Sequence, residues 1–391
     1  MKKILAMLLA LVMVMGLVAC GGNAPETTAP AETNAPAEST PAVSDVEYKI
    51  AMITDYGDIT DQSFNQTTYE AVKAFAETNG VDYTYYKPQG DSTAERIAMV
   101  DAAVVDGYNV IVMPGFAFGE TLAEVADIYP EVKFIALDVA EGEGGFAATE
   151  NVFSAVYQEE LSGYMAGYAA VKLGYTKLGF LGGMAVPAVI RFGYGYVQGA
   201  DAAAAELGIT IDMKYAYGNQ FYGDADITAV MDTWYQGGTE VVFSCGGGIY
   251  TSAVDAAKKV EGTKVIGVDV DQAGVIANYA GMSDKSLTVT SAMKGLYPTT
   301  VDTLTDVINN GNWAKYAGKV ATLGLVSGDD PTANYVQIPM ESTQWSDSFT
   351  QDDYKAMVKA MFDGTIVVSG DISAEPAVTN VNVDYQGQIV G

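Results

Sequence analysis

The 391-residue sequence predicts an α/β protein with two doubly wound parallel sheets, one in each of two lobes. Short apolar runs without strict alternation are separated by amphipathic stretches, a pattern typical of parallel strands covered by helices on both faces. This order of strand and helix occurs twice after residue 46. The segment that contains it is too long for one typical domain, which also favours two lobes.

The first series of elements begins at residue 48. Strands are expected at residues 48–54, 82–87, 109–115 and 133–138. Helices are expected at residues 65–80, 92–107 and 119–130. The first helix has apolar residues three positions apart and a stop signal at Asn79 and Gly80.

The second series follows residues 150–174, which are expected to form one helix that ends at Gly174. Its strands are expected at residues 177–183, 210–218, 240–247 and 264–270, and its helices at 195–208, 227–238 and 251–262. A strand at 286–292 and a helix at 294–311 come next, and residues 353–371 are expected to form a last helix and strand of the second lobe. By analogy with two-lobed folds, we expect the chain to return to the first lobe before it finishes in the second.

These elements define the expected limits of the two lobes. Lobe 1 is expected to comprise residues 47–150 with a return segment at 292–318. Lobe 2 is expected to comprise residues 151–291 with a C-terminal segment at 319–391.

The N-terminus predicts export and attachment to a lipid. Lys2 and Lys3 precede an apolar run that ends in Leu-Val-Ala-Cys, with Cys20 as its last residue. This pattern indicates a secretory signal at residues 1–19, and the cysteine resembles that of a bacterial lipobox, so acylation by palmitate at the extracytoplasmic face of the cell membrane is expected. An ordinary signal peptide with an incidental cysteine is the alternative. Residues 20–46 are rich in Pro, Ala, Thr, Ser and Glu, which predicts a flexible tether.

The composition excludes several classes of function. The formal charge of −29 disfavours nucleic acid as a partner, because its phosphates would be repelled, and favours solubility outside the cell. The sequence has no histidine, which excludes Ser-His-Asp and Cys-His catalysis and histidine-bound zinc. Cys245 therefore has no catalytic partner of this kind and is expected to be a buried strand residue. No phosphate-binding loop of the G-x-x-x-x-G-K-[ST] type is present.

Unusual residues follow the predicted strands in both series. They are Asp55, Gly115-Phe116, Asp138, Gly182-Gly183, Gly246 to Gly248 and Asp269. Ligands of open α/β sheets bind at the carboxyl ends of the strands. Two such edges that face each other across a hinge predict a cleft that can close on a ligand.

The stretch after the first strand contains the most distinctive group of side chains. Asp55, Asp58 and Asp61 are three residues apart, unlike the ligands of an EF-hand, so no metal site is expected. Acid–base catalysis by two carboxylates is physically allowed, but nothing in the sequence fixes a second carboxylate opposite. We expect Asp58 and Asp61 to be solvated or to cap the next helix, and Asp55 to contact a ligand. Phe64 could stack on a flat ligand, and the amide of Asn65 offers both a donor and an acceptor.

Residues 55–66, DYGDITDQSFNQ, resemble the D-x-G-x-x-D-D-x-S-F-N-Q signature of the basic membrane protein family of ABC-transporter lipoproteins, which includes purine nucleoside receptors. The chain departs from this pattern at Thr60, where the family often has Asp. The resemblance continues in order through residues 114–138, 151–170, 177–199, 237–248 and 264–272, and it is weaker after about residue 330.

The resemblance implies a type I periplasmic-binding-protein fold, in which two α/β lobes are joined by three crossover strands and hold a ligand between them. The ligand-binding residues that it implies, by position in this sequence, are Asp55, Phe64, Asn65, Asp138, Phe221, Gly247, Asp269 and Lys294.

The implied roles divide between base and sugar. Phe64 and Phe221 would stack on the two faces of a purine, and Asp55, Asn65 and Asp138 would hydrogen-bond its edge.

Asp269 and Lys294 would bind the ribose hydroxyls, and Gly247 with its neighbours would let the backbone approach the ligand. Tyr222 is an alternative to Phe221, and Asp271 an alternative to Asp269, because the stretches that contain them match the family less closely.

The function implied is the lipid-anchored solute-binding component of an ABC importer, which acts as a monomer, binds a purine nucleoside and needs no cofactor. Its partners would be a permease and an ATPase, and it would not be an enzyme. Alternatives are a receptor of the same fold for riboflavin or a sugar, a sensor lipoprotein that signals to a membrane kinase, and a carboxylate-dependent hydrolase.

Overall fold

We describe the protein from a computed structural model, in which residues 47–389 are described. The expected signal peptide, Cys20 and the tether lie outside these residues. Within residues 47–389, no helix combines the length and the apolar composition needed to cross a bilayer.

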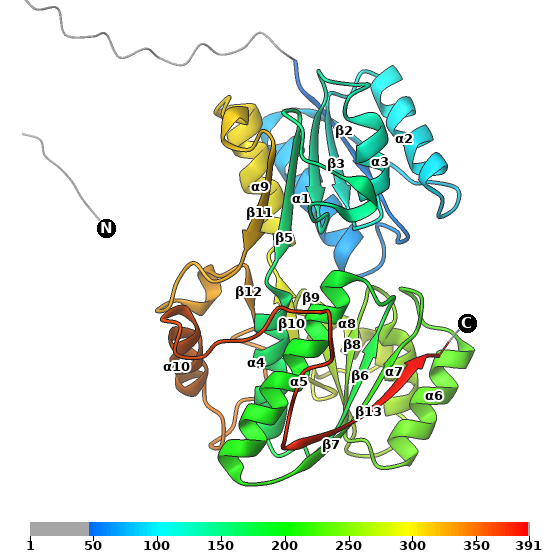
Figure 1. Cartoon of the computed structure of the whole chain (residues 1–391). Helices are drawn as coiled ribbons and strands as arrows, with labels where there is room; N and C mark the ends of the chain where they lie inside the picture. The colour runs from blue at the N-terminus through cyan, green and yellow to red at the C-terminus, as the bar shows by residue number, and fades with distance from the viewer. Residues whose placement is uncertain (1–46, 390–391) are drawn as a thin grey trace, which may run out of the picture. The chain divides into compact units, whose positions relative to one another are not determined.

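The first sheet has six strands in the order β11-β5-β4-β3-β1-β2, and every neighbouring pair is parallel (Figure 1). Its strands are β1 (Lys49–Ile53), β2 (Asp82–Tyr86), β3 (Val110–Pro114), β4 (Lys133–Leu137), β5 (Val152–Tyr157) and β11 (Lys319–Leu323). All residues of β3 and all but the first of β4 are buried, as expected for central strands covered on both faces.

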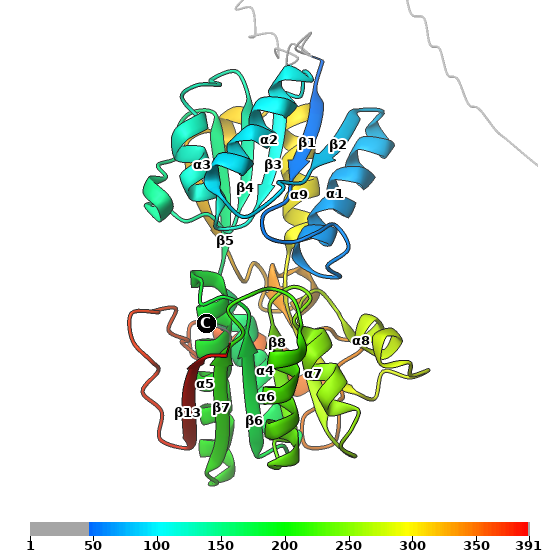
Figure 2. The same ribbon diagram turned by 90° about the vertical axis from the view of Figure 1, so that its right-hand side faces the viewer.

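Helices cover both faces of this sheet (Figure 2). They are α1 (Phe64–Asn79), α2 (Thr93–Val105), α3 (Phe118–Val125) and α9 (Leu296–Leu304), and a π-helix (Thr305–Asn309) continues α9. Val72 of α1 and Leu304 of α9 belong to one apolar core, and Val100 of α2 and Leu122 of α3 to the other. Ser92 caps α2 in a capping box with Glu95.

The second sheet has seven strands in the order β12-β10-β9-β8-β6-β7-β13, with β12 antiparallel to β10 and the other pairs parallel. Its strands are β6 (Lys177–Gly182), β7 (Ile211–Tyr217), β8 (Val241–Cys245), β9 (Lys264–Asp269), β10 (Thr288–Lys294), β12 (Val336–Gln337) and β13 (Val381–Gln388).

Two layers of helices cover this second sheet as well (Figure 1). The helices are α4 (Glu159–Lys172), α5 (Pro187–Leu207), α6 (Ala225–Gln236), α7 (Tyr250–Ala257), α8 (Ala273–Ala280) and α10 (Gln351–Phe362). One core contains side chains of α4, α5 and α10, and the core on the opposite face contains those of α6, α7 and α8. Short 3-10 turns lie at Glu143–Gly145, Trp313–Lys315 and Pro331–Ala333.

The chain passes between the sheets three times: after β5, after β10 and after β11. It therefore returns to the first sheet with α9 and β11. The limits expected from the sequence, at 150/151, 291/292 and 318/319, fall a few residues before these three crossings. The difference arises because β5, β10 and β11 stay paired with their neighbouring strands until the chain leaves the sheet.

Two expected elements are wrong. The stretch 150–174 is not one helix, because Val152–Tyr157 pairs with both β4 and β11 as strand β5, and only Glu159–Lys172 is helical. The β-branched and aromatic residues within Val152–Tyr157 favour a strand at this position. Residues 365–371 form no strand, and the chain instead ends its second sheet with β13, which pairs with β7.

Candidate functional site

A cavity of about 80 Å³ lies where the carboxyl ends of the strands of both lobes meet. The residues that line it include all eight that were predicted to bind a ligand: Asp55, Phe64, Asn65, Asp138, Phe221, Gly247, Asp269 and Lys294. The prediction that the strand ends converge on one cleft is therefore confirmed, while the roles of the individual side chains stay predictions.

Asp138 and Asp269 occupy equivalent positions in the two lobes. Asp138 directly follows β4, and Asp269 is the last residue of β9. Both have left-handed backbone conformations, with φ of 63° and 65°. Such a conformation costs about 1–3 kcal/mol in a residue other than glycine, and strained residues of this kind concentrate at functional sites.

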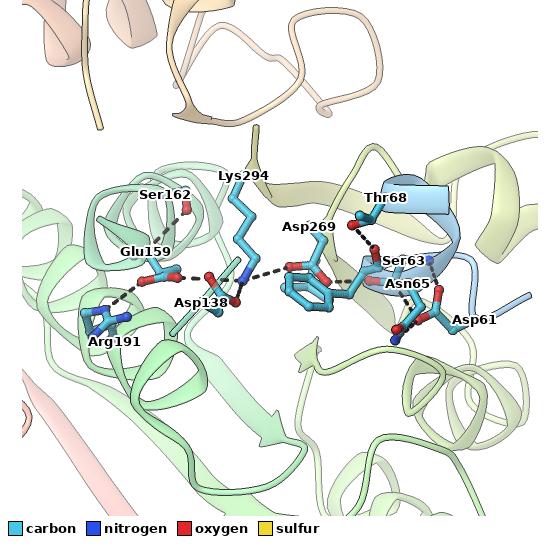
Figure 3. A network of polar contacts seen from close by, with 12 residues as sticks. Asp61, Ser63, Asn65, Thr68, Asp138, Glu159, Ser162, Arg191, Asp269 and Lys294 are labelled. Atoms are coloured by element: carbon cyan, nitrogen blue, oxygen red, sulfur yellow. Dashed lines mark hydrogen bonds and ion pairs between the residues drawn. The ribbon is translucent and has the colours of Figure 1, made fainter. Parts of the chain in front are cut away.

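Lys294 is the centre of a buried network of charges that joins the two lobes (Figure 3). Its Nζ atom, at the end of β10, forms an ion pair with Asp138 of the first lobe. The same nitrogen lies 3.6 Å from Glu159 Oε1 and 3.7 Å from Asp269 Oδ1. Arg191 on α5 donates from Nε to Glu159 Oε2 at 2.6 Å. The network thus contains three carboxylates and two cations.

The environment keeps Lys294 charged. Burial lowers its pKa, but the carboxylates of Asp138, Asp269 and Glu159 outweigh burial and raise the pKa above its ordinary value. Burial raises the pKa of Asp269, and Lys294 and Ser63 oppose that rise. Burial likewise raises the pKa of Glu159, against the effect of Arg191 and Lys294.

Asp55, Asp61 and Asn65 form a second polar group at the start of α1. Asn65 Nδ2 donates to Asp55 Oδ1 at 3.0 Å and to Asp61 Oδ2 at 3.1 Å. Burial raises the pKa of Asp55 to about 6, although hydrogen bonds from Asn65 and Gly57 oppose the rise. The expectation that Asp61 caps the helix is confirmed, because it accepts from the backbone N–H of Ser63, Asn65 and Gln66.

Aromatic rings line the cavity from both lobes. Phe64 is the first residue of α1, and its ring centroid lies 4.7 Å from Lys294 Nζ. Phe221 lies between β7 and α6, and its ring centroid is 6.2 Å from that of Tyr56 in the first lobe. Two glycines at strand ends leave room for the Phe221 ring: a Cβ at Gly183 would lie 2.5 Å from its Cδ1, and one at Gly246 would lie 3.0 Å from the same atom.

The structure separates the alternatives that the sequence left open. Tyr222 is 61% exposed and does not line the cavity, unlike Phe221. Asp271 does not line the cavity either, and its Oδ1 accepts from the N–H of Ala273 at the start of α8. Asp58 is at the surface, where it forms an ion pair of 2.6 Å with Lys87.

Several lining or neighbouring residues were not predicted. Val189 and Phe192 add apolar surface to the cavity, beside the expected Phe116. Glu159 lies next to Lys294, and Arg191 forms an ion pair with Glu159. A charged residue within a largely apolar stretch, as in Val-Ile-Arg-Phe around Arg191, was the signal that could have indicated buried charges.

The arrangement is suited to holding a ligand. Among residues 47–389, no group of three or more acidic or cysteine side chains is placed to hold a metal ion. Cys245 lines the cavity and is buried, and burial raises the pKa of its thiol, which disfavours the reactive thiolate. Two α/β lobes around one lined cavity are the architecture of bilobal ligand-binding proteins.

Comparisons with known proteins agree with this class. A protein of Aeropyrum pernix K1, described as an ABC transporter system solute-binding protein, has the same fold with a TM-score of 0.65 and 23% identity, over 82% of this chain and 87% of that chain. The predicted type I periplasmic-binding-protein fold is confirmed. The ABC transporter nucleoside-binding protein BmpA of Lactococcus lactis subsp. cremoris is 29% identical over 296 residues, 72% of this chain and 80% of BmpA. An uncharacterized lipoprotein of Pyrococcus furiosus is 25% identical over 328 residues, 80% of this chain and 77% of that protein.

The profile of the Bmp family, described as "ABC transporter substrate-binding protein PnrA-like", matches residues 48–364. The chain belongs to this family. It is therefore an ABC transporter substrate-binding protein, a class that binds small molecules and acts with a permease and an ATPase.

Proposed function

We propose that the protein is a lipid-anchored receptor that binds a purine nucleoside outside the cytoplasm and delivers it to an ABC permease. One observation carries the proposal: rings from opposite lobes, Phe64 and Phe221, line one cavity together with carboxylates and an amide. A flat heterocycle with polar edges has the complementary shape and chemistry. The name of the lactococcal relative, a nucleoside-binding protein, supports the same ligand class.

In the proposed complex, the base lies between Phe64 and Phe221. Asp55, Asn65 and Asp138 hydrogen-bond the polar edge of the base.

Asp269 and Lys294 bind the ribose hydroxyls, since a carboxylate accepts from a hydroxyl and an ammonium group donates to one. Gly247 lies two residues after the end of β8 and has a φ of 51°. A glycine at this position lets the backbone approach the sugar closely.

The charges of the cavity favour a neutral nucleoside over a nucleotide. Four aspartates line it, Asp55, Asp61, Asp138 and Asp269, and Lys294 is the one lysine or arginine among its lining residues. A phosphate group would meet like charge at short range and low dielectric. Nucleoside monophosphates should therefore bind much more weakly than the corresponding nucleosides.

The lobes would close around the ligand and open to release it. Besides the ion pair between Lys294 and Asp138, two hydrogen bonds connect them: Ser63 Oγ donates to Asp269 Oδ2 at 2.6 Å, and Gln272 Nε2 donates to the carbonyl oxygen of Gln62 at 3.1 Å. Both bonds connect the start of α1 to the edge of the second sheet, so they would break when the lobes open.

The anchor in this proposal is acylated Cys20, which would hold the protein at the extracytoplasmic face of the membrane. The lipoprotein name of the Pyrococcus relative supports the assignment. Mass spectrometry of the N-terminal peptide from protein expressed in a bacterial host tests it. Cleavage before Cys20 with added acyl chains is expected, and an unmodified cysteine would contradict the anchor.

Mass spectrometry of the small molecule that copurifies with the protein tests the ligand, followed by calorimetric titration of the stripped protein. A purine nucleoside released intact, and rebound with 1:1 stoichiometry, is the expected result. Free base formed during incubation would instead indicate a hydrolase. If riboflavin or ribose binds and nucleosides do not, the protein is a receptor for that other ligand. If the neighbouring genes encode a sensor kinase and no permease, a role in signalling is favoured over transport.

A further inference from the structure

Ser63 stands at the N-cap of α1 but does not cap the helix with its side chain. A serine at this position usually accepts a hydrogen bond from an N–H group in the first turn of the helix. Here Asp61 takes that role and accepts from the backbone N–H groups of Ser63, Asn65 and Gln66. The hydroxyl of Ser63 is therefore available for another partner.

The partner of this hydroxyl is Asp269, which lines the cavity from the opposite lobe (Figure 3). Ser63 is fully buried, and its Oγ donates to Asp269 Oδ2 at 2.6 Å. A serine hydroxyl carries one hydrogen, so this bond uses the only donor of the side chain. Asp269 is 5% exposed and has a left-handed backbone conformation. The bond therefore fixes a carboxylate whose backbone is already constrained.

The other oxygen of Asp269 stays apart from Lys294. Its Oδ1 atom lies 3.7 Å from Lys294 Nζ, whereas a direct hydrogen bond between an ammonium group and a carboxylate is about 2.7–2.9 Å long. A nitrogen and an oxygen at this separation can both contact one ligand hydroxyl, which accepts from the ammonium group and donates to the carboxylate. Without Ser63, the opposite charges would draw Asp269 toward Lys294, and the two groups would satisfy each other.

We propose that Ser63 is a positioning residue for the sugar end of the cavity, which holds Asp269 apart from Lys294 so that both stay available to the hydroxyls of a ribose. The ligands that this arrangement selects are ribonucleosides, and it rejects 2′,3′-dideoxynucleosides, which have no hydroxyl on these two carbons. This inference rests on the proposed function, because it concerns the sugar of the same ligand.

The position of Ser63 couples this selection to closure of the lobes. Ser63 follows β1 of the first sheet, and Asp269 ends β9 of the second sheet. The bond between them therefore exists only when the lobes are closed, so Asp269 takes its ligand-binding position at that stage. A nucleoside without the hydroxyls gains nothing from it.

Calorimetric titration of the stripped wild-type protein provides the first test. The ligands are guanosine, inosine and adenosine, each beside its 2′,3′-dideoxy counterpart. A ribonucleoside that binds should do so at least about tenfold more tightly than its counterpart, which leaves Lys294 and Asp269 without ligand partners. Ratios below about threefold would refute the inference and leave the proposed function intact. If no nucleoside binds, both fail.

The variant Ser63→Ala provides the second test, with Ser244→Ala as the matched control. Ser244 is also fully buried, and its hydroxyl donates to the carbonyl oxygen of Ile266 at 3.0 Å. The ratio of ribonucleoside to dideoxynucleoside affinity should fall by about tenfold in Ser63→Ala and stay within about twofold of wild type in Ser244→Ala. Loss of a bond between the lobes would by itself weaken both ligands equally, so an unchanged ratio in Ser63→Ala would overturn the role of Ser63.

A second variant keeps the test decisive if Ser63→Ala does not fold. Ser63→Cys preserves the shape of the side chain, but a thiol is a weak donor. The ratio should fall in this variant as well, and a ratio equal to that of the wild-type protein would contradict the inference. Far-UV circular dichroism shows which of the two variants is folded before the titration.

Discussion

Replacement of Lys294 by methionine should strongly destabilise the protein, because it removes the centre of the buried charge network. The side chain of Lys294 is 4% exposed and lies within 3.7 Å of Glu159 and Asp269, besides its ion pair with Asp138. Without its ammonium group, Arg191 is the remaining cation in contact with this network. Methionine preserves most of the apolar volume, so the change tests the charge.

The expected magnitude follows from the burial of the partners. Removal of one partner from a buried ion pair typically costs 3–5 kcal/mol, because the remaining charge is left without compensation. We expect a loss of about 3–5 kcal/mol in the free energy of unfolding at pH 8. The carboxyl groups left behind should have pKa values above those in the unfolded chain. Their protonation in the folded state then restores stability as the pH falls, so the loss should shrink toward pH 5.

Urea unfolding of the ligand-free protein, followed by far-UV circular dichroism at pH 8 and pH 5, measures this loss. The matched control is Lys87→Met, since Lys87 forms a surface ion pair with Asp58 and half of its side chain is exposed. The control should cost less than about 1 kcal/mol at both pH values. A loss below about 1 kcal/mol for Lys294→Met, or an equal loss at pH 8 and pH 5, would refute the reasoning.

Three further predictions concern the ligand, a buried acid and a helix crossing. Phe64→Ala should weaken nucleoside binding by about 10- to 100-fold through lost stacking and burial, whereas Asp58→Ala should change it less than about twofold; equal effects in calorimetry would contradict the site. Glu160 is 6% exposed and burial raises its pKa from 4.5 to about 7, which costs roughly 3 kcal/mol above that pH and nothing below the unfolded pKa. Glu160→Gln should therefore raise the urea midpoint at pH 8.5 and leave it unchanged at pH 4.5, and a gain that does not depend on pH would exclude this cause. Gly167→Ala should destabilise by about 1–3 kcal/mol in thermal unfolding, because its Cβ would lie 2.1 Å from the carbonyl oxygen of Tyr196 on α5; an unchanged midpoint would mean that α4 and α5 separate without cost.

The convergence of the predicted site residues has a simple topological cause. In a parallel sheet, every strand ends at the same edge, so Asp55 and Asp138, which each follow a strand of the first sheet, lie at one edge although they are far apart in sequence. Asp269 ends a strand of the second sheet, and its edge lines the same cavity. The strand pattern was therefore sufficient to bring them together. The resemblance to a known family added Phe221 and Lys294, which periodicity alone does not distinguish from core residues.

The wrong elements have an equally local explanation. The stretch Val152–Tyr157 leads into α4 after a single residue, Gln158, with no glycine or proline between them, and its pairing with β4 and β11 identifies it as a strand. Residues 365–371 are apolar and β-branched in part, yet they find no partner strand, and β13 pairs with β7 instead. Strand formation depends on long-range partners, which single-sequence patterns do not contain.

The sequence by itself determined the two α/β lobes, the edges at which ligands bind and the family, because these depend on local periodicity and on a long collinear motif. Only the tertiary structure decided how the polar groups are paired. Arg191 and Glu159 meet because α4 and α5 cross closely, and Asn65 faces two carboxylates because the turn at Gly57 folds back on α1. Hydrogen bonds and ion pairs depend on distances and angles between distant segments, and these are fixed only when the helices and sheets pack together.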